Sequence, residues 1–248
     1  MDKGRDTVSE SATAWAWRDL SVDVWSGVFV PNKTTELLLE GALEQGIVGK
    51  SVLDLGCGSG AVGIAALKVG GAARVSGSDI SQRAVDNAIA NCTKLGVTAD
   101  YRQGSLFEPW AGRQYEVIID DVAALAEPIA RLSPWYPPEI HCDAGPDGTA
   151  NTIRMLERAV DYLTPDGHLY FPVASLSDEV KILKVARSRF PRVELLLRKP
   201  WPFREDFWQK IMANETARKL VDEGIVKVVQ RGSRMLWDTA IYMACARA

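Results

Sequence analysis

The amino-acid sequence predicts an α/β protein built on a doubly wound, mainly parallel sheet of seven strands. Residues 51–199 alternate short β-branched runs with amphipathic helical patterns, which is typical of parallel strands joined by helices. A glycine-rich turn directly follows the first of these runs, at the place where such sheets bind ligands. The 248 residues, of which 47% are hydrophobic, suffice for one large domain with a buried core.

The strands are expected where β-branched and aromatic residues gather between turn residues. Within the regular alternation they are residues 51–56, 73–79, 98–104, 115–121, 167–173 and 193–199. The helix between the second and third strands is the clearest one. Ser81 is suited to cap its first turn, and Gly96 is suited to end it.

Two segments lie outside this alternation. Residues 1–46 are predicted to form an N-terminal helical cover, with helices over TAWAWRDLSVDVW and TTELLLEGALEQG. Residues 47–248 form the main domain, in which the aromatic-rich residues 200–224 are expected to form a lid, followed by edge strands at 225–230 and 239–246. The tryptophans of these extensions either cover a ligand or form the core of the extensions themselves: Trp15, Trp17, Trp25, Trp201, Trp208 and Trp237.

Composition excludes several classes of protein. No apolar run approaches the roughly 20 residues that span a bilayer, and the first residues lack the pattern of a signal peptide. We therefore expect a cytoplasmic protein without a membrane partner. Four cysteines without a C-x-x-C spacing and two histidines predict neither a metal site nor a disulfide framework. Residues 181–248 hold 15 basic and 7 acidic side chains, but such a run is usually a solvated face, and nucleic acid is not expected as a partner.

The glycine-rich turn runs from Asp54 through Gly56 and Gly58 to Gly60, and an apolar helical pattern begins directly after it. Glycines let the backbone approach a ligand closely, and a helix start offers free N–H donors. Asp79 ends the next strand, where a carboxylate can accept hydrogen bonds from both hydroxyls of a ribose. The carboxylate of Asp54 would repel a pyrophosphate but suits a ligand that carries an amine. This combination favours S-adenosylmethionine over a dinucleotide.

The segment VLDLGCGSG resembles the first motif of the class I S-adenosylmethionine-dependent methyltransferases, a Rossmann-like superfamily. Within it, residues 27–175 are most similar to the HemK-like glutamine methyltransferases that modify peptide release factors. The segment GVFVP with TELL at 35–38, and AGPDG at 144–148, carry this resemblance.

The resemblance implies the cofactor contacts. Asp54, Gly56, Gly58 and Gly60 would surround the methionine moiety and the ribose, and Asp79 with Ile80 would hold the ribose and adenine. Adenine would be flanked by Gly104, Ser105 and Leu106. Asp120, at the end of the fourth strand, is expected to contact the cofactor and also to act on the acceptor.

The sequence departs from the HemK-like pattern after the fourth strand. Relatives that methylate an amide or an exocyclic amine have N-P-P-Y there, whereas this chain has Asp121-Val122-Ala123-Ala124. Asp120 and Asp121 are therefore the candidate catalytic residues, able to bind an ammonium group or to take a proton. Alternatively, one of them only caps a helix near Ala123 and the other is solvated. His141 is a further candidate base, although a lone loop histidine is more often structural.

We therefore expect an enzyme that transfers the methyl group of S-adenosylmethionine to a small molecule, in secondary metabolism. Three alternatives remain open. The first is an enzyme that cyclises S-adenosylmethionine alone to azetidine-2-carboxylate and methylthioadenosine. The second is a HemK-like protein or RNA methyltransferase, and the third is a protein that only senses the cofactor. The oligomeric state is not predicted.

Overall fold

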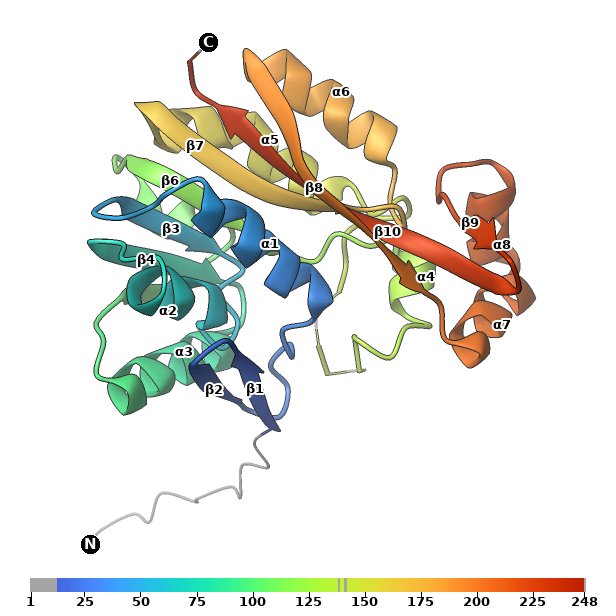
Figure 1. The fold of residues 1–248 in the computed structure, drawn as a ribbon, viewed down its shortest axis with the longest axis horizontal. Coiled ribbons are helices and arrows are strands. Elements are labelled where there is room, and N and C mark those ends of the chain that lie inside the picture. Colours follow the sequence, from blue (N-terminus) through green and yellow to red (C-terminus); the bar gives the residue numbers. More distant parts are fainter. Residues whose placement is uncertain (1–12, 138, 141, 248) are drawn as a thin grey trace, which may run out of the picture.

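An eight-stranded sheet runs through the molecule in the computed structural model, which describes residues 13–137, 139–140 and 142–247 (Figure 1). Its strands follow the order β5-β4-β3-β6-β7-β10-β8, and the short β9 pairs with β10. Their bounds are β3 Ser51–Leu55, β4 Arg74–Asp79, β5 Asp100–Gln103, β6 Tyr115–Asp120, β7 Leu163–Ala174, β8 Arg192–Pro202, β9 Val229–Arg231 and β10 Arg234–Cys245.

The strand directions confirm the predicted fold class. The five strands from β5 to β7 are parallel to their neighbours, whereas β10 runs antiparallel to β7 and β8. All six strands of the predicted alternation are present. The two predicted edge strands correspond to the short β9 and to β10, so the sheet has eight strands in place of the predicted seven.

Helices cover both faces of the sheet (Figure 1). The helices α1 Lys33–Glu44, α2 Ala61–Lys68 and α3 Gln82–Leu95 pack on one face, and α5 Ala150–Tyr162 and α6 Glu179–Arg189 pack on the other. The others are the 3-10 turn η1 Glu108–Trp110 and the helices α4 Glu127–Ala130, α7 Glu205–Ala213 and α8 Glu215–Asp222. As predicted, Ser81 caps α3 by accepting a hydrogen bond from the Ala84 N–H, and Gly96 ends it at φ 65°.

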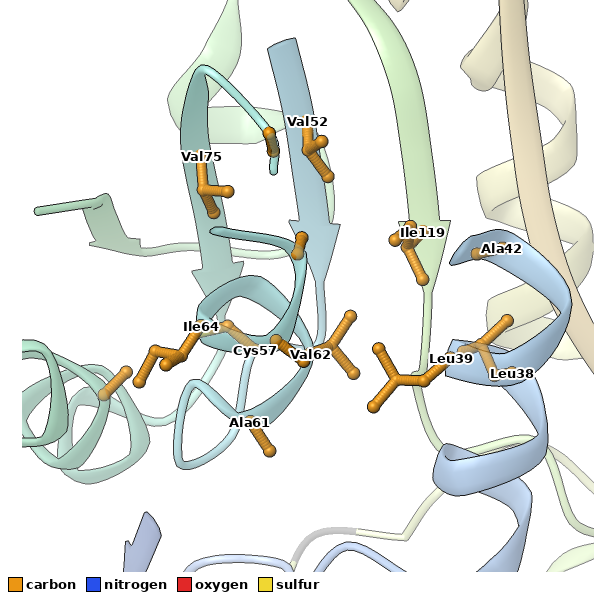
Figure 2. Close-up of a cluster of buried hydrophobic side chains, with 14 of the residues drawn as sticks. Leu38, Leu39, Ala42, Val52, Cys57, Ala61, Val62, Ile64, Val75 and Ile119 are labelled. Carbon is orange, nitrogen blue, oxygen red and sulfur yellow. The ribbon is translucent and has the colours of Figure 1, made fainter. Parts of the chain in front are cut away.

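The core forms two layers because successive strand residues point to opposite faces. Val52 and Ile119 belong to the layer beneath α1, α2 and α3, while Leu53 and Ile118 belong to the layer beneath α5 and α6. Figure 2 shows Leu39 of α1 and Val62 of α2 beside Ile119 of β6. Each such fully buried side chain contributes about 1.5–3 kcal/mol, so this packing fixes the strand ends that carry the site.

The predicted helix over residues 13–25 is wrong. Residues 13–24 form a hairpin of β1 Thr13–Trp17 and β2 Leu20–Val24, joined by a tight turn in which Arg18 has φ 52°. The physical reason is the period of burial: Trp15 and Trp17, then Leu20, Val22 and Val24, are buried at every second position, which a strand allows and a helix does not. The second part of the predicted cover is confirmed, because α1 occupies the segment TTELLLEGALE.

Two buried asparagines of α3 attach the hairpin to the domain. Asn87 Oδ1 accepts a hydrogen bond from the Trp25 N–H at 2.9 Å, and Asn91 Oδ1 accepts one from the Asp23 N–H at 3.0 Å. Asn91 Nδ2 donates both to the Asp23 carbonyl at 2.8 Å and to the Ser59 carbonyl at 2.9 Å. Asn91 thereby joins the hairpin to the glycine-rich turn.

None of the described helices is both long enough and apolar enough to cross a bilayer.

Candidate functional site

A cavity of about 590 Å³ opens at the carboxyl ends of the parallel strands, where doubly wound sheets bind ligands. The loops after β3, β4, β5 and β6 form one side of it, and the segment between β2 and α1 forms another. Most of the residues predicted for the site line this cavity: Gly56, Gly58, Asp79, Ile80, Gly104, Ser105, Leu106 and Asp121.

The three glycines of the turn have different tasks. All have positive φ angles, of 74°, 50° and 81° for Gly56, Gly58 and Gly60. A Cβ on Gly56 would lie 3.0 Å from a Val122 methyl group, and one on Gly60 would lie 3.0 Å from Ala88 Cβ. A Cβ on Gly58 would meet no atom closer than the Gly56 carbonyl oxygen, at 3.9 Å. Gly56 and Gly60 thus allow close packing, whereas Gly58 leaves space in the cavity.

Asp79 holds the turn and the following loop together. Its Oδ2 accepts a hydrogen bond from the Gly58 N–H at 3.0 Å, and its Oδ1 accepts one from the Ser81 N–H at 2.9 Å. Beside it, the Ile80 side chain is 56% exposed at the cavity wall, an apolar surface suited to a flat ring. Across from Ile80, the Ser105 N–H donates to Glu108 Oε2 at 2.8 Å, which fixes the loop after β5.

Asp54 and Gly60 lie behind the cavity lining. Asp54 is fully buried, and its Oδ2 accepts a hydrogen bond from the Gly63 N–H at 2.9 Å. Its Oδ1 has no hydrogen-bond partner among the described residues. Burial, with smaller contributions from Asp121 and Asp79, raises the pKa of Asp54 to about 8. Asp54 therefore anchors the first turn of α2, directly after the glycine-rich turn, and does not line the cavity.

The structure separates the two candidate acids after β6. Asp121 lines the cavity, and its Oδ2 accepts a hydrogen bond from the Thr35 hydroxyl at 2.7 Å. Burial raises the pKa of Asp121 to about 6. Asp120 pairs with Leu55 in the sheet and does not line the cavity. It is 1% exposed, its Oδ1 has no partner among the described residues, and burial and the charge of Asp121 raise its pKa well above the usual range.

The alternative role as a helix cap is wrong for both acids, because α4 begins only at Glu127 and is preceded by Ala126. His141 lies outside the described residues.

Four aromatic side chains among the described residues line one side of the cavity, and the sequence had not singled out two of them, Trp135 and Tyr136. The four are Phe29, Trp135 and Tyr136, together with Trp237 from β10. The rings of Phe29 and Tyr136 lie 5.2 Å apart, and those of Trp135 and Trp237 lie 5.1 Å apart. The segment SPWYPP, in which two aromatics stand between prolines, was the one available signal for Trp135 and Tyr136.

The predicted lid lies behind this aromatic wall. None of residues 200–224, all of which are described, lines the cavity, and Phe207 of α7 packs edge-on against Trp135 at 5.5 Å. Trp15 and Trp17 belong to the buried core beneath the hairpin. Of the six tryptophans in the extensions, Trp237 alone lines this cavity.

The strand order, the glycine-rich turn and the cavity at its edge define a class I S-adenosylmethionine-dependent methyltransferase. Residues 20–121 match the model of a family described as "Methyltransferase small domain", and the chain belongs to this superfamily. Its fold is similar to that of the 16S rRNA N2 G1207 methyltransferase of T. thermophilus, solved with AdoMet and guanosine. That likeness has a TM-score of 0.61 at 16% identity and covers 95% of this chain and 50% of the other.

The chain is also similar to curated proteins. It is 30% identical over 175 residues to a release factor glutamine methyltransferase of Geobacter sulfurreducens, a match that covers 67% of this chain and 60% of the relative. It is 43% identical over 103 residues to a ribosomal protein L11 methyltransferase of Aeromonas salmonicida, covering 41% of this chain and 34% of the relative. The chain thus spans less than two thirds of the length of both relatives.

These relatives correct the prediction about partners. A small molecule, or S-adenosylmethionine alone, was expected as the substrate, and nucleic acid was not expected. The names of the relatives instead specify proteins, and the structural neighbour acts on ribosomal RNA. The prediction of a small-molecule acceptor is therefore wrong. It relied on the acid pair and on the missing N-P-P-Y motif, and these features concern the reacting group but not the size of the molecule that carries it.

The cavity fits S-adenosylmethionine, the cofactor of this superfamily. The space over Gly58 fits its methionine part, and the exposed face of Ile80 fits its adenine. The carboxylates of Asp79 and Asp121 in the cavity lining fit its ribose hydroxyls and its positive charges. When bound, S-adenosylmethionine supplies an electrophilic methyl group on a sulfonium.

We expect binding of S-adenosylmethionine to release protons. A cation in the cavity favours the charged forms of Asp121 and Asp54, whose pKa values of about 6 and 8 therefore fall on binding. Because the deprotonated protein binds the cation more tightly, affinity should rise as the pH increases from about 5.5 to 7.5. Calorimetry in two buffers of different ionisation enthalpy measures the released protons. S-adenosylhomocysteine, which lacks the sulfonium charge, is the control, and equal proton release by both ligands would contradict the expectation.

Proposed function

We propose that this protein transfers the methyl group of S-adenosylmethionine to a protein, one that belongs to the translation apparatus. Relatives similar to it in sequence are named for release factor and ribosomal protein substrates. The observation that carries the proposal is the pair of adjoining cavities. The 590 Å³ cavity shares Pro31, Trp135 and Glu139 with a second, more open cavity of about 380 Å³.

The second cavity has the lining of a surface that accepts a polypeptide. Three prolines and two tryptophans are part of it, because Trp25, Pro134 and Pro137 lie beside the shared Pro31 and Trp135. Rigid aromatic and proline surfaces bind extended chains without much loss of side-chain entropy. We infer that the target side chain enters the first cavity while its main chain lies along the second.

The residues of the turn and its neighbours have these roles in the proposal. Gly56, Gly58 and Gly60, held by Asp54 from behind, position the methionine part of the cofactor. Asp79 binds the ribose, and Ile80, Gly104, Ser105 and Leu106 enclose the adenine. Asp121 faces the acceptor. Asp120 is assigned a structural role, because its buried carboxylate lies away from the cavity lining.

The test is a labelling experiment with tritiated S-adenosylmethionine, the purified enzyme and a ribosome-containing lysate from cells that lack the enzyme. We expect label in one protein band that survives ribonuclease and disappears with protease. Label that disappears with ribonuclease would show an RNA methyltransferase instead. Label only in small products would also overturn the proposal.

A further inference from the structure

The acceptor side of the cavity differs from an amide-binding site in its charge. Among the described residues that line the cavity, Asp79, Asp121, Glu139 and Asp143 are acidic, whereas Arg154 is the one basic residue. Asp121 directly follows β6, and its carboxylate accepts a hydrogen bond from the Thr35 hydroxyl. A carboxylate offers about four acceptor positions, so Asp121 keeps capacity for a donor that enters the cavity.

The backbone after Asp121 is already used within the chain. Asn151 Nδ2 donates to the Ala123 carbonyl at 3.0 Å and to the Asp143 carbonyl at 2.9 Å. Ala123 stands at the second proline position of the N-P-P-Y pattern, so the carbonyl there is engaged by a side chain of α5. The chain therefore lacks the asparagine side chain that would orient a planar amide, and its carbonyl at the second proline position already accepts one hydrogen bond.

The aromatic wall completes a site for a cation. Phe29, Trp135, Tyr136 and Trp237 line the same cavity as Asp121, and Tyr136 lies close enough for the Asp121 charge to raise its pKa. An ammonium group is attracted to the negative faces of aromatic rings, and this attraction persists after methylation. A half-buried carboxylate and aromatic rings together favour a cationic amine over a neutral amide.

From this geometry, and resting on the proposed function, we propose that the acceptor is an amine of the target protein, a lysine ε-amino group or an N-terminal α-amino group. Asp121 is the residue that selects it and takes its proton. The proton moves from nitrogen to the Asp121 carboxylate, and the freed lone pair forms the new N–C bond. The C–S bond breaks with its electron pair on sulfur, which leaves S-adenosylhomocysteine.

The environment of Asp121 is suited to this proton transfer. With a pKa of about 6, Asp121 is ionised at neutral pH. It is also a stronger base than an exposed aspartate, which brings its pKa closer to that of a desolvated amine and eases the transfer of the proton. The titratable and charged groups around it, on the strands, loops and helices that form the site, are Asp54, Asp79, Asp120, Tyr136, Glu139, Asp143 and Arg154.

The first test identifies the methylated atom. The labelled protein is hydrolysed in strong acid, which cleaves a methylated glutamine amide to methylamine but leaves methyl-lysine and N-methyl amino acids intact. The hydrolysate is then made alkaline, so that methylamine becomes volatile. We expect non-volatile label, and tandem mass spectrometry then distinguishes lysine from the N-terminus. Volatile label would overturn the amine proposal while leaving the proposed function standing. Label in RNA would refute both.

The second test uses Asp121→Asn, which restores the residue of the amide-methylating relatives. We expect at least a 100-fold loss of kcat/KM on the labelled protein, with the affinity for S-adenosylhomocysteine within threefold of wild type. Binding gives an independent readout by saturation-transfer NMR with two probes, Nα-acetyl-lysine methylamide and Nα-acetyl-glutamine methylamide. The wild type should prefer the lysine probe and the variant should lose that preference. Asp161→Asn, an exposed change of the same charge on α5, should alter neither. An unchanged preference in Asp121→Asn would contradict the proposal.

Discussion

Replacing Gly58 by valine is expected to abolish binding of S-adenosylmethionine while the protein still folds. The Cβ of residue 58 would meet no atom closer than 3.9 Å, so the side chain extends into the cavity instead of into the core. At φ 50° a β-branched residue costs about 1–3 kcal/mol of stability, which a domain of this size can bear. We expect at least a 100-fold loss of affinity by calorimetry.

Gly96→Val is the matched control for this prediction. Gly96 has a similar φ of 65°, its Cβ would also meet nothing within 4 Å, and it ends α3 without lining the cavity. The two variants should lose similar stability in thermal unfolding, but Gly96→Val should bind S-adenosylmethionine normally. Normal binding by Gly58→Val would refute the assigned place of the cofactor.

Gly148→Ala is expected to cause the largest loss of stability among single methyl additions. A Cβ there would lie 2.4 Å from the Ala126 nitrogen and 2.6 Å from the Leu125 carbonyl carbon, and both are backbone atoms. The Ala126 N–H also donates to the Leu176 carbonyl at 3.0 Å, so the segment cannot shift without breaking this bond. Together with the positive φ of 75°, we expect a loss of about 3–5 kcal/mol, seen as a fall of about 10 °C in Tm.

Gly224→Ala separates the two causes of this loss. Gly224 has φ 71° but open space around its Cβ position, so its substitution reports the backbone term alone. We expect a loss of about 1 kcal/mol, a few degrees in Tm. Equal losses of stability in Gly148→Ala and Gly224→Ala would contradict the prediction, because the loop at residues 144–149 would then accommodate the added methyl group without a loss of stability.

The strands and the cofactor turn could be predicted because their signals are local. A β-branched run followed by glycines and an apolar helix requires no knowledge of distant residues, and the structure has β3, the turn and α2 in that order. The hairpin was misassigned because its turn at Arg18 and Asp19 lacks glycine and asparagine. The alternation of buried and exposed residues also changes phase at this turn. The buried residues have odd numbers before it, at Trp15 and Trp17, and even numbers after it, at Leu20 and Val22.

The sequence could not distinguish the roles of Asp120 and Asp121, because the end of β6 is buried in the middle of the sheet. The last residues of β6 are buried on both faces, so hydrophobicity does not reveal which face each side chain takes. The register that pairs Asp120 with Leu55 settles its orientation, and the Thr35 hydroxyl that meets Asp121 comes from 86 positions away. Likewise, only the folded chain brings Trp237 beside Trp135.

The asparagine attachment of the hairpin also sets an order of folding. The hydrogen bonds from Asn87 and Asn91 span 62 and 68 positions, and neither side chain has its geometry until α3 has formed. Closing so long a loop is favourable only after the intervening β3-α2-β4-α3 unit has ordered. The hairpin, which leaves the ribosome before α3, is therefore among the last segments to dock, and a nascent chain must keep Trp15 and Trp17 exposed until residue 91 has emerged.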